Sequence, residues 1–371
     1  DRLRPAPLPA PGQFSLAFLR MRLLSTDTKI LIGQAMWRLI RLGFAGRMHW
    51  ADRPFADFLS ETGQSEDARR LFWDPVVISA CNLPCHEVAG NHAMQVFQES
   101  FLAGGWQATM GLATCDLRSL YDSAISGVEE AGGLISLGTS VRGIAFDGIR
   151  ANGVVTDEGL ISAAAIISTV PPDRLAKLVS RPMAAADPRL MNLHRFEFSP
   201  ILGVHLFFKT PVLRDDVRTY PHLVLPGRAT QWFFNKGQDE SGLHHVHAVI
   251  SAADDWMQLD EEAIAARVLE DLYWAMPGSR GLVPVEVRSV KEKRATFRAS
   301  PGIDAIRPSA RPGGFGVPNL YLAGDWCDTG WPATMEGAAR SGYSAAAAVT
   351  GVGGVISDVP AGPLARGMGL R

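Results

Sequence analysis

The sequence has little net charge and few cysteines. Its 371 residues include 36 Lys and Arg against 38 Asp and Glu, which gives a net charge of −2. This balance excludes a protein that binds nucleic acid through bulk positive charge, and it excludes a long acidic tail. The 4 cysteines stand at positions 81, 85, 115 and 327, and no second pair or histidine set completes a zinc site beside Cys81 and Cys85. We therefore expect reduced apolar thiols, no metal and no nucleic-acid partner.

Long apolar segments are missing as well. No uncharged apolar run reaches the length of about 18 residues that a membrane-spanning helix needs. A secretory signal, with its basic start and small-residue cleavage site, is not recognisable. We therefore expect a cytoplasmic protein. The chain begins at Asp1 within a proline-rich run rather than at Met, and we interpret this start as an N-terminal truncation.

The remaining composition is that of a globular protein, with 47% hydrophobic residues. A chain of this length holds about two domains. Helical periodicity fills the first part of the sequence, where residues 25–27 (Ser, Thr, Asp) cap a helix that ends at Gly43. The expected helices cover residues 14–24, 28–42, several segments of 52–103 separated by Gly63 and Pro75, and a segment that starts at Asp260 and ends at Pro277.

From Gly132 onward the pattern changes to short strands divided by turns. Residues 164–170 form a continuous apolar run, which predicts a strand buried on both faces. The expected strands cover residues 134–137, 141–146, 151–156, 164–170, 201–209, 231–235 and 246–252. Helices and strands in this order predict a mixed α/β fold in which the chain crosses between two lobes.

Basic residues dominate the first 50 positions. Asp27 is the one acidic residue between positions 2 and 51, and the basic residues that stand among apolar ones are Arg20, Arg22, Lys29, Arg38, Arg41 and Arg47. A basic, apolar helix pair is able to lie on an anionic membrane surface. A buried helix pair with solvated arginine tips explains the pattern equally well.

The clearest pattern lies between Asn319 and Gly342. A buried strand is followed by a turn at Gly324 and Asp325, and then by a small-residue helix that begins near Ala333. In open α/β sheets, an Asp at the carboxyl end of a strand faces the crevice where ligands bind. The start of the next helix offers unpaired N–H groups. These residues alone favour a ligand at a strand–helix junction no more than they favour a plain strand–turn–helix.

Residues 322–325 (Leu-Ala-Gly-Asp) and 333–338 (Ala-Thr-Met-Glu-Gly-Ala) resemble the C-terminal FAD signature of the amine oxidase and phytoene desaturase superfamily. Within it, nearly the whole chain is similar to the squalene-associated FAD-dependent desaturases, which are the hydroxysqualene dehydroxylases of hopanoid biosynthesis. The segments that carry this similarity are residues 72–75, 79–82, 231–236, 249–252, 291–297, 301–302, 307–308, 325–326 and 329–332.

The resemblance implies a mixed α/β (α+β) fold class, with an FAD/NAD(P)-binding Rossmann-like domain and an interleaved substrate-binding lobe. The Gly-x-Gly-x-x-Gly unit that begins the superfamily is not found in the sequence, so we expect this chain alone not to hold FAD tightly. The implied parts are a mainly helical substrate- or membrane-facing lobe (1–130), strands of the FAD domain (131–172), a substrate domain (173–290), a C-terminal FAD-binding segment (291–350) and a tail (351–371).

FAD is the implied cofactor. In the superfamily, the Asp at the position of Asp325 contacts the ribityl or pyrophosphate region, and the backbone near Thr334 supports the flavin ring. The strand that begins at Val141 resembles the one whose backbone contacts the adenine. The implied cofactor-binding residues are Val141, Gly324, Asp325, Ala333, Thr334, Met335 and Gly337. The candidates to face an apolar isoprenoid substrate are Trp232, Trp326 and Trp331.

The resemblance implies that reduced flavin converts hydroxysqualene to squalene, with water as the leaving group. A proton donor is required for this, and Asp74, Tyr121, Asp325 and Glu336 are equal candidates. A carotenoid or phytoene-type desaturase and an inactive membrane-surface or partner-binding fragment are the alternatives. We interpret the histidines at 244, 245 and 247 as solvated loop residues, because only His245 and His247 would share a strand face.

Overall fold

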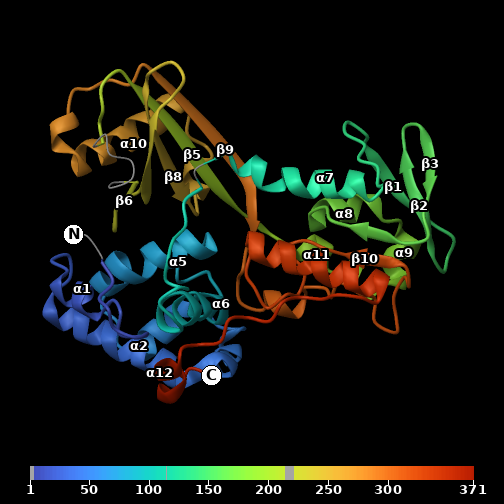
Figure 1. Ribbon diagram of the computed structural model, residues 1–371, viewed down its shortest axis with the longest axis horizontal. Coiled ribbons are helices and arrows are strands. Elements are labelled where there is room, and N and C mark those ends of the chain that lie inside the picture. Colours follow the sequence, from blue (N-terminus) through green and yellow to red (C-terminus); the bar gives the residue numbers. More distant parts are fainter. Residues whose placement is uncertain (1–3, 114, 214–220) are drawn as a thin grey trace.

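Three hydrophobic cores form in the computed structural model, which describes residues 4–113, 115–213 and 221–371. The first core joins residues 24–103 to residues 361–370, and we call this part the helical lobe. The second joins residues 144–196 to residues 297–327, and with the helix that follows we call it the junction domain. The third lies between residues 202 and 272, in the sheet lobe. Figure 1 shows the helical lobe at the lower left, the sheet lobe above it and the junction domain on the right.

Short helices build the helical lobe around a group of aromatic rings. Trp73 is fully buried, and its ring centroid lies 4.7 Å from that of Phe97 and 5.7 Å from that of Phe55. Its Nε1 donates a hydrogen bond of 2.9 Å to Oε1 of Gln64, which satisfies the buried indole N–H. The elements are α1 (Ser15–Arg20), α2 (Thr26–Gly46), a 3-10 turn (Arg47–Trp50), α3 (Phe55–Glu61), α4 (Glu66–Ala68), a π-helical turn (Arg69–Trp73), α5 (Asp74–Cys81), α6 (Gly90–Gln95) and a second π-helical turn (Val96–Leu102).

Helix α2 is capped and interrupted at the residues that the sequence predicts. Ser25 accepts a hydrogen bond of 3.2 Å from the N–H of Thr28. At Gly43 the backbone leaves the helical conformation with φ of 66°. The carbonyl oxygens of Gly369 and Arg371 lie 3.2 Å from the place that a Cβ on Gly43 would take. Both the left-handed backbone and this close approach therefore favour glycine here.

The prediction that Pro75 separates two helices is wrong. Residues 66–81 form one continuous helical segment, and Pro75 lies in the first turn of α5. Proline interrupts a helix because it lacks an N–H donor and because its ring clashes with the carbonyl four residues before it. The π-helical turn at Arg69–Trp73 has already shifted the hydrogen-bonding pattern just before Pro75, so the segment continues past it.

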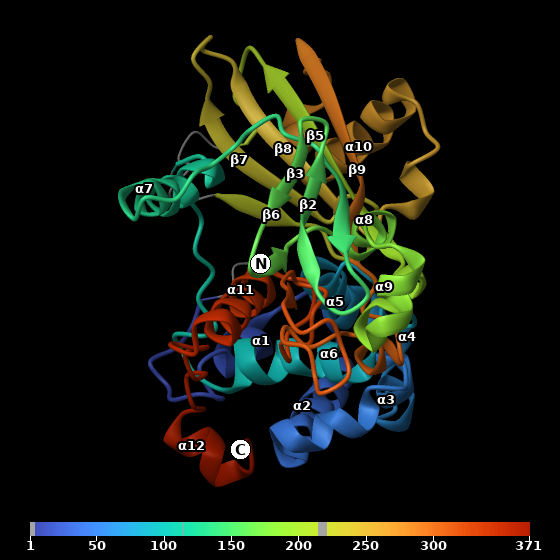
Figure 2. The same ribbon diagram turned by 90° about the vertical axis from the view of Figure 1, so that its right-hand side faces the viewer.

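The sheet lobe is an antiparallel sheet with α10 (Glu261–Ala275) packed on one face (Figure 2). Alternate residues of the strand Phe198–Phe208, from Leu202 to Phe208, are buried against Ile264, Val268 and Leu272 of α10. The strand predictions 201–209, 231–235 and 246–252 and the cap at Asp260 are confirmed. In the order β6-β7-β8-β5-β9, the strands are β6 (His222–Val224), β7 (Trp232–Gln238), β8 (His244–Ser251), β5 (Phe198–Phe208) and β9 (Glu286–Phe297).

The junction domain contains the parallel strand pair and the helix that follows it. Strand β10 (Leu320–Leu322) pairs in parallel with β4 (Ile166–Ser168) and leads into α11 (Met335–Thr350). The strand predictions 141–146 and 151–156 are confirmed as β1 and β2 of a small antiparallel sheet. The remaining elements are β1 (Val141–Phe146), β2 (Ala151–Thr156), β3 (Gly159–Ser162), α8 (Pro172–Leu178) and α9 (Arg181–Ala186).

Two strand predictions in this region are wrong. Residues 134–137 form no strand, and the side chains of Leu134 and Leu137 are 95% and 89% exposed. A strand needs a neighbour for its backbone groups, and none of the described segments pairs with these residues. Residues 164–170 contribute only the short β4, whose Ile167 is 43% exposed. Its neighbours Ile166 and Ser168 are buried, so β4 is buried on one face only.

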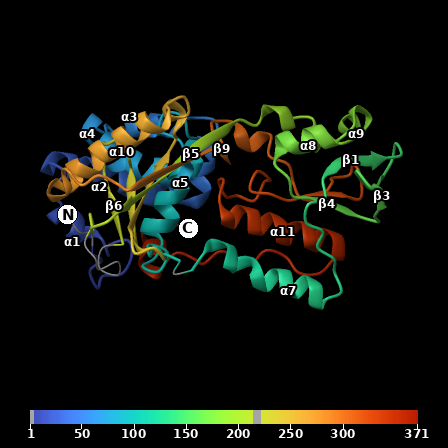
Figure 3. The ribbon, with the colours of Figure 1, turned by 90° about the horizontal axis from the view of Figure 1, so that it is seen from above.

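The three hydrophobic cores place the boundaries between the parts of the chain at other residues than the expected ones. Residues 173–196 pack in the junction domain, and β9 crosses the expected boundary at 290. Helix α12 (Pro363–Met368) packs against α2, so the expected tail is part of the helical lobe. Helix α7 (Asp122–Glu130) lies on the junction-domain side of the molecule in Figures 1 and 3 rather than in the helical lobe. None of the helices in the described ranges is both long and apolar enough to cross a bilayer.

Replacing Gly43 with alanine should lower the free energy of unfolding by about 1–3 kcal/mol, because the left-handed φ strains an L-residue and the new Cβ would press on two carbonyl groups. Gly33→Ala is the matched control in the same helix. An added Cβ on Gly33 meets nothing within 4 Å, so this change should stabilise the protein by up to about 1 kcal/mol. Urea unfolding of both variants measures the difference, and equal stability of the two would contradict the explanation.

Candidate functional site

The loop between β10 and α11 gathers main-chain and side-chain polar groups at the carboxyl end of the parallel strand pair. The N–H of Ala323 donates a hydrogen bond of 2.9 Å to the carbonyl of Ser168 on β4. The N–H of Gly324 donates one of 2.7 Å to Oγ of Ser341 on α11. A Cβ on Gly324, whose φ is 146°, would collide with the indole of Trp326. Glycine is therefore needed for the chain to turn from strand to loop at this point.

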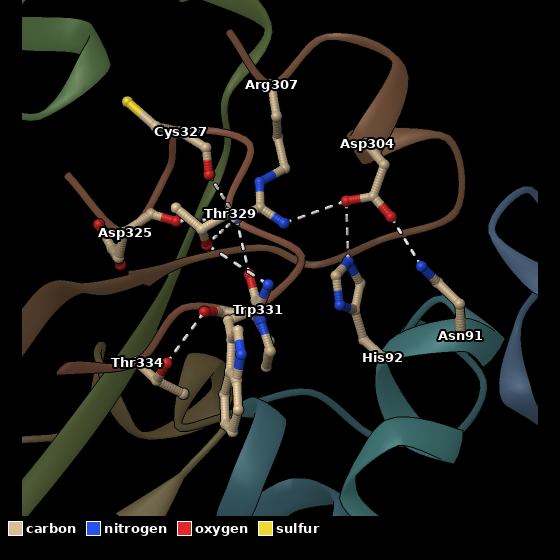
Figure 4. Close-up of polar contacts among 10 residues, drawn as sticks. Asn91, His92, Asp304, Arg307, Asp325, Cys327, Thr329, Trp331 and Thr334 are labelled. Atoms are coloured by element: carbon tan, nitrogen blue, oxygen red, sulfur yellow. Dashed lines mark hydrogen bonds and ion pairs between the residues drawn. The ribbon is translucent and has the colours of Figure 1, made fainter. Parts of the chain in front are cut away.

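Arg307 holds this loop in place. Its side chain is 0% exposed, and its guanidinium lies over the ring of Phe297 at 5.2 Å. It donates hydrogen bonds to the main-chain carbonyls of Asp325 (3.0 Å), Cys327 and Trp331 (2.7 Å), as Figure 4 shows. Because one buried cation binds three carbonyls of residues 325–331, this stretch of the loop has little freedom to move.

Asp304 balances the charge of Arg307 and connects the loop to the helical lobe. Its carboxylate lies 3.1 Å from Nη1 of Arg307 and accepts a hydrogen bond of 2.7 Å from Nδ2 of Asn91. It also contacts Nε2 of His92 at 3.0 Å, and both partners belong to α6 (Figure 4). Burial by itself would raise the pKa of Asp304, but His92, Asn91 and Arg307 together hold that pKa well below its usual value. The carboxyl therefore stays ionised at neutral pH.

The side chain of Asp325 differs from that of Asp304. Burial raises the pKa of Asp325, against the opposing effects of the Trp326 N–H and the Arg307 charge. Arg307 binds the main-chain carbonyl of Asp325, and no ion pair to its carboxyl occurs among the residues that the structure describes. A partly buried carboxyl with no cationic partner is suited to accept hydrogen bonds from the hydroxyl groups of a ligand.

The first turn of α11 closes the other end of the loop. Oγ1 of Thr334 accepts a hydrogen bond of 3.0 Å from the N–H of Gly337, which caps the helix. The first N–H groups of a helix have no acceptor within it, so those of Met335 and Glu336 remain available. A Cβ on the buried Gly337 would approach the carbonyl of Pro332 to 3.0 Å, so helix and loop pack closely. A carboxyl at one end and helix-start donors at the other fit the polar chain and the electron-rich ring edge of a flavin.

A protein-family model matches most of the chain. The family model of flavin-containing amine oxidoreductases matches residues 33–350. The chain belongs to this family. The mixed α/β fold class and the FAD cofactor that the resemblance implied are those of its members.

Two groups of named proteins are among the relatives of the chain. The chain is 30% identical to the hydroxysqualene dehydroxylase of Sinorhizobium fredii over 277 residues, which cover 73% of this chain and 60% of that protein. It is 28% identical to the hydroxysqualene dehydroxylase of Rhodopseudomonas palustris over 285 residues, 75% of this chain and 62% of that protein. It is 23% identical to a probable zeta-carotene desaturase of Synechococcus elongatus over 329 residues, which cover 80% of this chain and 66% of that protein. The chain thus spans about three fifths of the length of the dehydroxylases that it matches.

The fold is similar to that of cyclohexylamine oxidase from Brevibacterium oxydans. The TM-score is 0.65 at 17% identity, and the match covers 88% of this chain and 76% of that chain. An oxidoreductase from Methanosarcina mazei gives a TM-score of 0.65 at 18% identity, and the match covers 85% of this chain and 72% of that chain. At these identities the similarity shows the fold alone.

The structure brings most of the predicted cofactor residues together. They occupy the loop after β10 and the first turn of α11, and Figure 4 shows Asp325 and Thr334 at the left of the view. Val141 lies elsewhere, at the first residue of β1. The residues that share the loop and the helix start are Gly324, Asp325, Ala333, Thr334, Met335 and Gly337.

The prediction that Trp326 faces substrate is wrong. Its side chain is 2% exposed and packs edge-on against Phe196 at a centroid distance of 5.7 Å, inside the core of the junction domain. Trp331 is partly buried, and the guanidinium of Arg340 lies 5.1 Å from its ring. Trp232 is partly buried on β7, with its Nε1 2.6 Å from Oγ of Ser79 on α5. Trp331 and Trp232 remain candidates for a substrate-facing surface.

The four candidate proton donors do not converge. Asp74 accepts a hydrogen bond of 3.2 Å from the N–H of Cys85 within the helical lobe. Tyr121 is exposed at the end of a 3-10 turn, and Glu336 is exposed and paired with Arg340 at 2.7 Å. Of the four, Asp325 lies within the loop that Arg307 organises.

A cluster of histidines was not recognised from the sequence, and its members were wrongly expected to be exposed to solvent. The interpretation of residues 244–247 as solvated loop histidines is wrong, because they lie on β8 and are partly buried. His247 stacks on His205 of β5 at 4.1 Å, and Nδ1 of His205 lies 2.9 Å from Nε2 of His245. Burial, followed by the neighbouring His205, lowers the pKa of His245 and of His247 to about 4. These rings are therefore neutral at pH 7.

Arg307, Asp304 and His92 were missed as well, although positions 307–308 were part of the resemblance. The charge of Arg307 was visible in the sequence, but its partners lie on separate elements. His92 and Asp304 are 212 positions apart. An arginine followed by proline (Arg307, Pro308), shortly before the flavin signature, is the sequence signal that could have identified it.

Replacing Arg307 with lysine should lower the free energy of unfolding by about 2–4 kcal/mol. Lysine keeps the charge, but a single ammonium cannot reach three carbonyls and Asp304 together, so buried acceptors lose their donor. Arg311→Lys is the control, because Arg311 is exposed four positions later. Chemical denaturation of both variants gives the two values, and a loss below about 0.5 kcal/mol for Arg307→Lys would refute the role assigned to this side chain.

Proposed function

We propose that the complete protein is a FAD-dependent oxidoreductase that converts hydroxysqualene to squalene. The observation that carries this proposal is the similarity to three hydroxysqualene dehydroxylases, at 27–30% identity over 73–75% of the chain. The geometry of the β10–α11 loop supports the cofactor part of the proposal. The reaction replaces a C–O bond with a C–H bond and releases water, so it takes up two electrons and two protons.

The residues of the β10–α11 loop would hold the cofactor. The carboxyl of Asp325 would accept hydrogen bonds from cofactor hydroxyl groups, and the N–H groups at the start of α11 would face the ring edge. FAD, when bound, supplies the hydride chemistry. Arg307 keeps the loop carbonyls turned inward, so the loop presents a fixed set of donors and acceptors.

The sheet lobe offers a surface for an apolar substrate. The face of the sheet opposite α10 carries the stacked rings of Trp232 and Phe234, whose centroids lie 5.6 Å apart, and His222 beside them. Burial lowers the pKa of His222, so this ring is neutral at pH 7. A partly buried, uncharged aromatic surface would exclude water from a hydrocarbon substrate and from the developing charge at its reacting carbon.

A carotenoid-type desaturase is the second candidate function. The similarity to a probable zeta-carotene desaturase extends over 80% of the chain, although its identity is only 23%. Such an enzyme would move hydride in the opposite direction on a related hydrocarbon. The loop and the aromatic surface suit both reactions, so the substrate test has to separate them.

The decisive experiment uses the complete gene product, purified with FAD and reduced with dithionite under anaerobic conditions. Incubation with hydroxysqualene should yield squalene and re-oxidise the flavin in equal amount. Bound flavin without squalene, but with dehydrogenation of phytoene by the oxidised protein, would replace the first proposal with the second. A protein that retains no flavin would overturn both.

Replacing Asp325 with alanine should weaken FAD binding by about 10- to 100-fold, because a hydrogen bond to a charged group contributes about 1.5–3 kcal/mol. Asp328→Ala is the matched control, since Asp328 lies in the same loop but is exposed. Titration of the apoprotein with FAD, followed by flavin fluorescence, gives both dissociation constants. Equal constants for the two variants would remove Asp325 from the cofactor site.

A further inference from the structure

Helices α1 and α2 expose more large apolar side chains than the helical lobe needs for its core. Helix α2 buries one face, on which Ile32, Ala35 and Leu39 lie. The opposite face carries Trp37, whose side chain is 50% exposed. We call the exposed apolar side chains of these helices, and of the turn between them, the α1–α2 face: Leu16, Leu19, Leu23, Ile30 and Trp37.

The two helices form one continuous surface. Nζ of Lys29 donates a hydrogen bond of 2.9 Å to the carbonyl of Leu19, which joins the first turn of α2 to α1. Phe18 and Met21 pack into the core of the helical lobe, so α1 is fixed on its inner side while its leucines stay outside. In Figure 1, α1 and α2 lie along the edge of the helical lobe that faces away from the junction domain.

Positive charge surrounds this face. Arg20 and Arg41 are exposed on α1 and α2, and Asp27 is the one acidic residue between positions 2 and 51. Helix α12 packs beside α2 and adds Arg366, and no acidic residue follows Asp358. The protein as a whole has a net charge of −2, so the basic character is local to this side of the molecule.

We propose that the α1–α2 face docks on the surface of an anionic lipid bilayer. Its leucine, isoleucine and tryptophan side chains would enter the boundary between headgroups and acyl chains, and its basic side chains would contact lipid phosphates. A second copy of the chain is a poor occupant, because a symmetric pairing would place two basic faces against each other. The helices lie on the bilayer rather than across it, in keeping with their length and composition.

This inference does not depend on the proposed reaction, although a hydrocarbon substrate that dissolves in membranes would agree with it. Its test is co-sedimentation of the complete gene product with vesicles of phosphatidylcholine alone, or of phosphatidylcholine mixed with phosphatidylglycerol. We expect binding to the anionic vesicles only, and release in about 1 M NaCl, at which the Debye length falls to about 3 Å.

Two variants examine the two kinds of contact separately. Leu19→Asp with Trp37→Asp removes apolar insertion, and Arg20→Glu with Arg41→Glu reverses the charge. Each pair should weaken partitioning into anionic vesicles at least about tenfold. Ile149→Asp with Arg150→Glu is the matched control, since both side chains are exposed on the β1–β2 turn at the opposite end of the molecule (Figure 1).

Partitioning that is unchanged in both variant pairs, or equal on neutral and anionic vesicles, would overturn the proposal. A dimer without lipid that the same substitutions convert to a monomer would also overturn it, and would assign the face to a second copy. Dehydroxylation measured in detergent micelles should not change in the variants. A failure of vesicle binding is therefore distinguishable from a failure of the proposed reaction.

Discussion

The buried guanidinium of Arg307 is the interaction on which the site depends. An arginine removed from water costs several kcal/mol unless its donors and its charge are balanced. Here Asp304 supplies the charge at Nη1 and three loop carbonyls accept from Nη2, while the buried Nε has no hydrogen-bond partner among the described residues. Since Asp304 is itself held by Asn91 and His92, the loop after β10 keeps its shape only while α6 stays in place. The cost of one buried charge thus couples the helical lobe to the loop after β10.

The glycines of the flavin signature are required by the packing of the backbone, whether or not a ligand is bound. Gly324 avoids the Trp326 indole, and Gly337 lets α11 approach the Pro332 carbonyl. Each would be needed for the strand, loop and helix to pack, with or without a cofactor. The motif therefore describes a backbone shape, and the chemistry comes from what that shape exposes, namely the Asp325 carboxyl and the donors at the start of α11.

Local signals in the sequence predicted much of the fold. The cap at Ser25, the break at Gly43 and the alternating strands of the sheet lobe depend on neighbouring residues, and the structure confirms them. Residues 134–137 show where such signals fail, because their pattern suits a strand while strand pairing depends on distant segments. The prediction that Trp326 faces substrate was wrong for a related reason. An aromatic residue beside a site has the same sequence context whether it faces ligand or core, and only packing against Phe196 decides between them.

Asn82 shows how the helical lobe is attached to the sheet lobe. It ends α5 in a left-handed conformation with φ of 54°, and its Nδ2 donates to the carbonyl of Ser199 (3.1 Å) and to Oγ1 of Thr296 (2.9 Å). Its Oδ1 accepts the N–H of Ala252 at 2.6 Å, so one side chain contacts three separate strands or strand ends. Cutting any of these bonds would leave a buried polar group unpaired.

The helical lobe is therefore a fixed wall of the site rather than a hinged lid. Asn82 and the Trp232–Ser79 hydrogen bond attach it to the sheet lobe, and Asp304 attaches it to the loop after β10. Independent movement of the lobe would break buried polar contacts on two sides at once, and each unpaired group costs about 1–3 kcal/mol. The precision of the loop geometry depends on this rigidity, because the Arg307–Asp304 pair that holds the loop is itself anchored to α6 of the helical lobe.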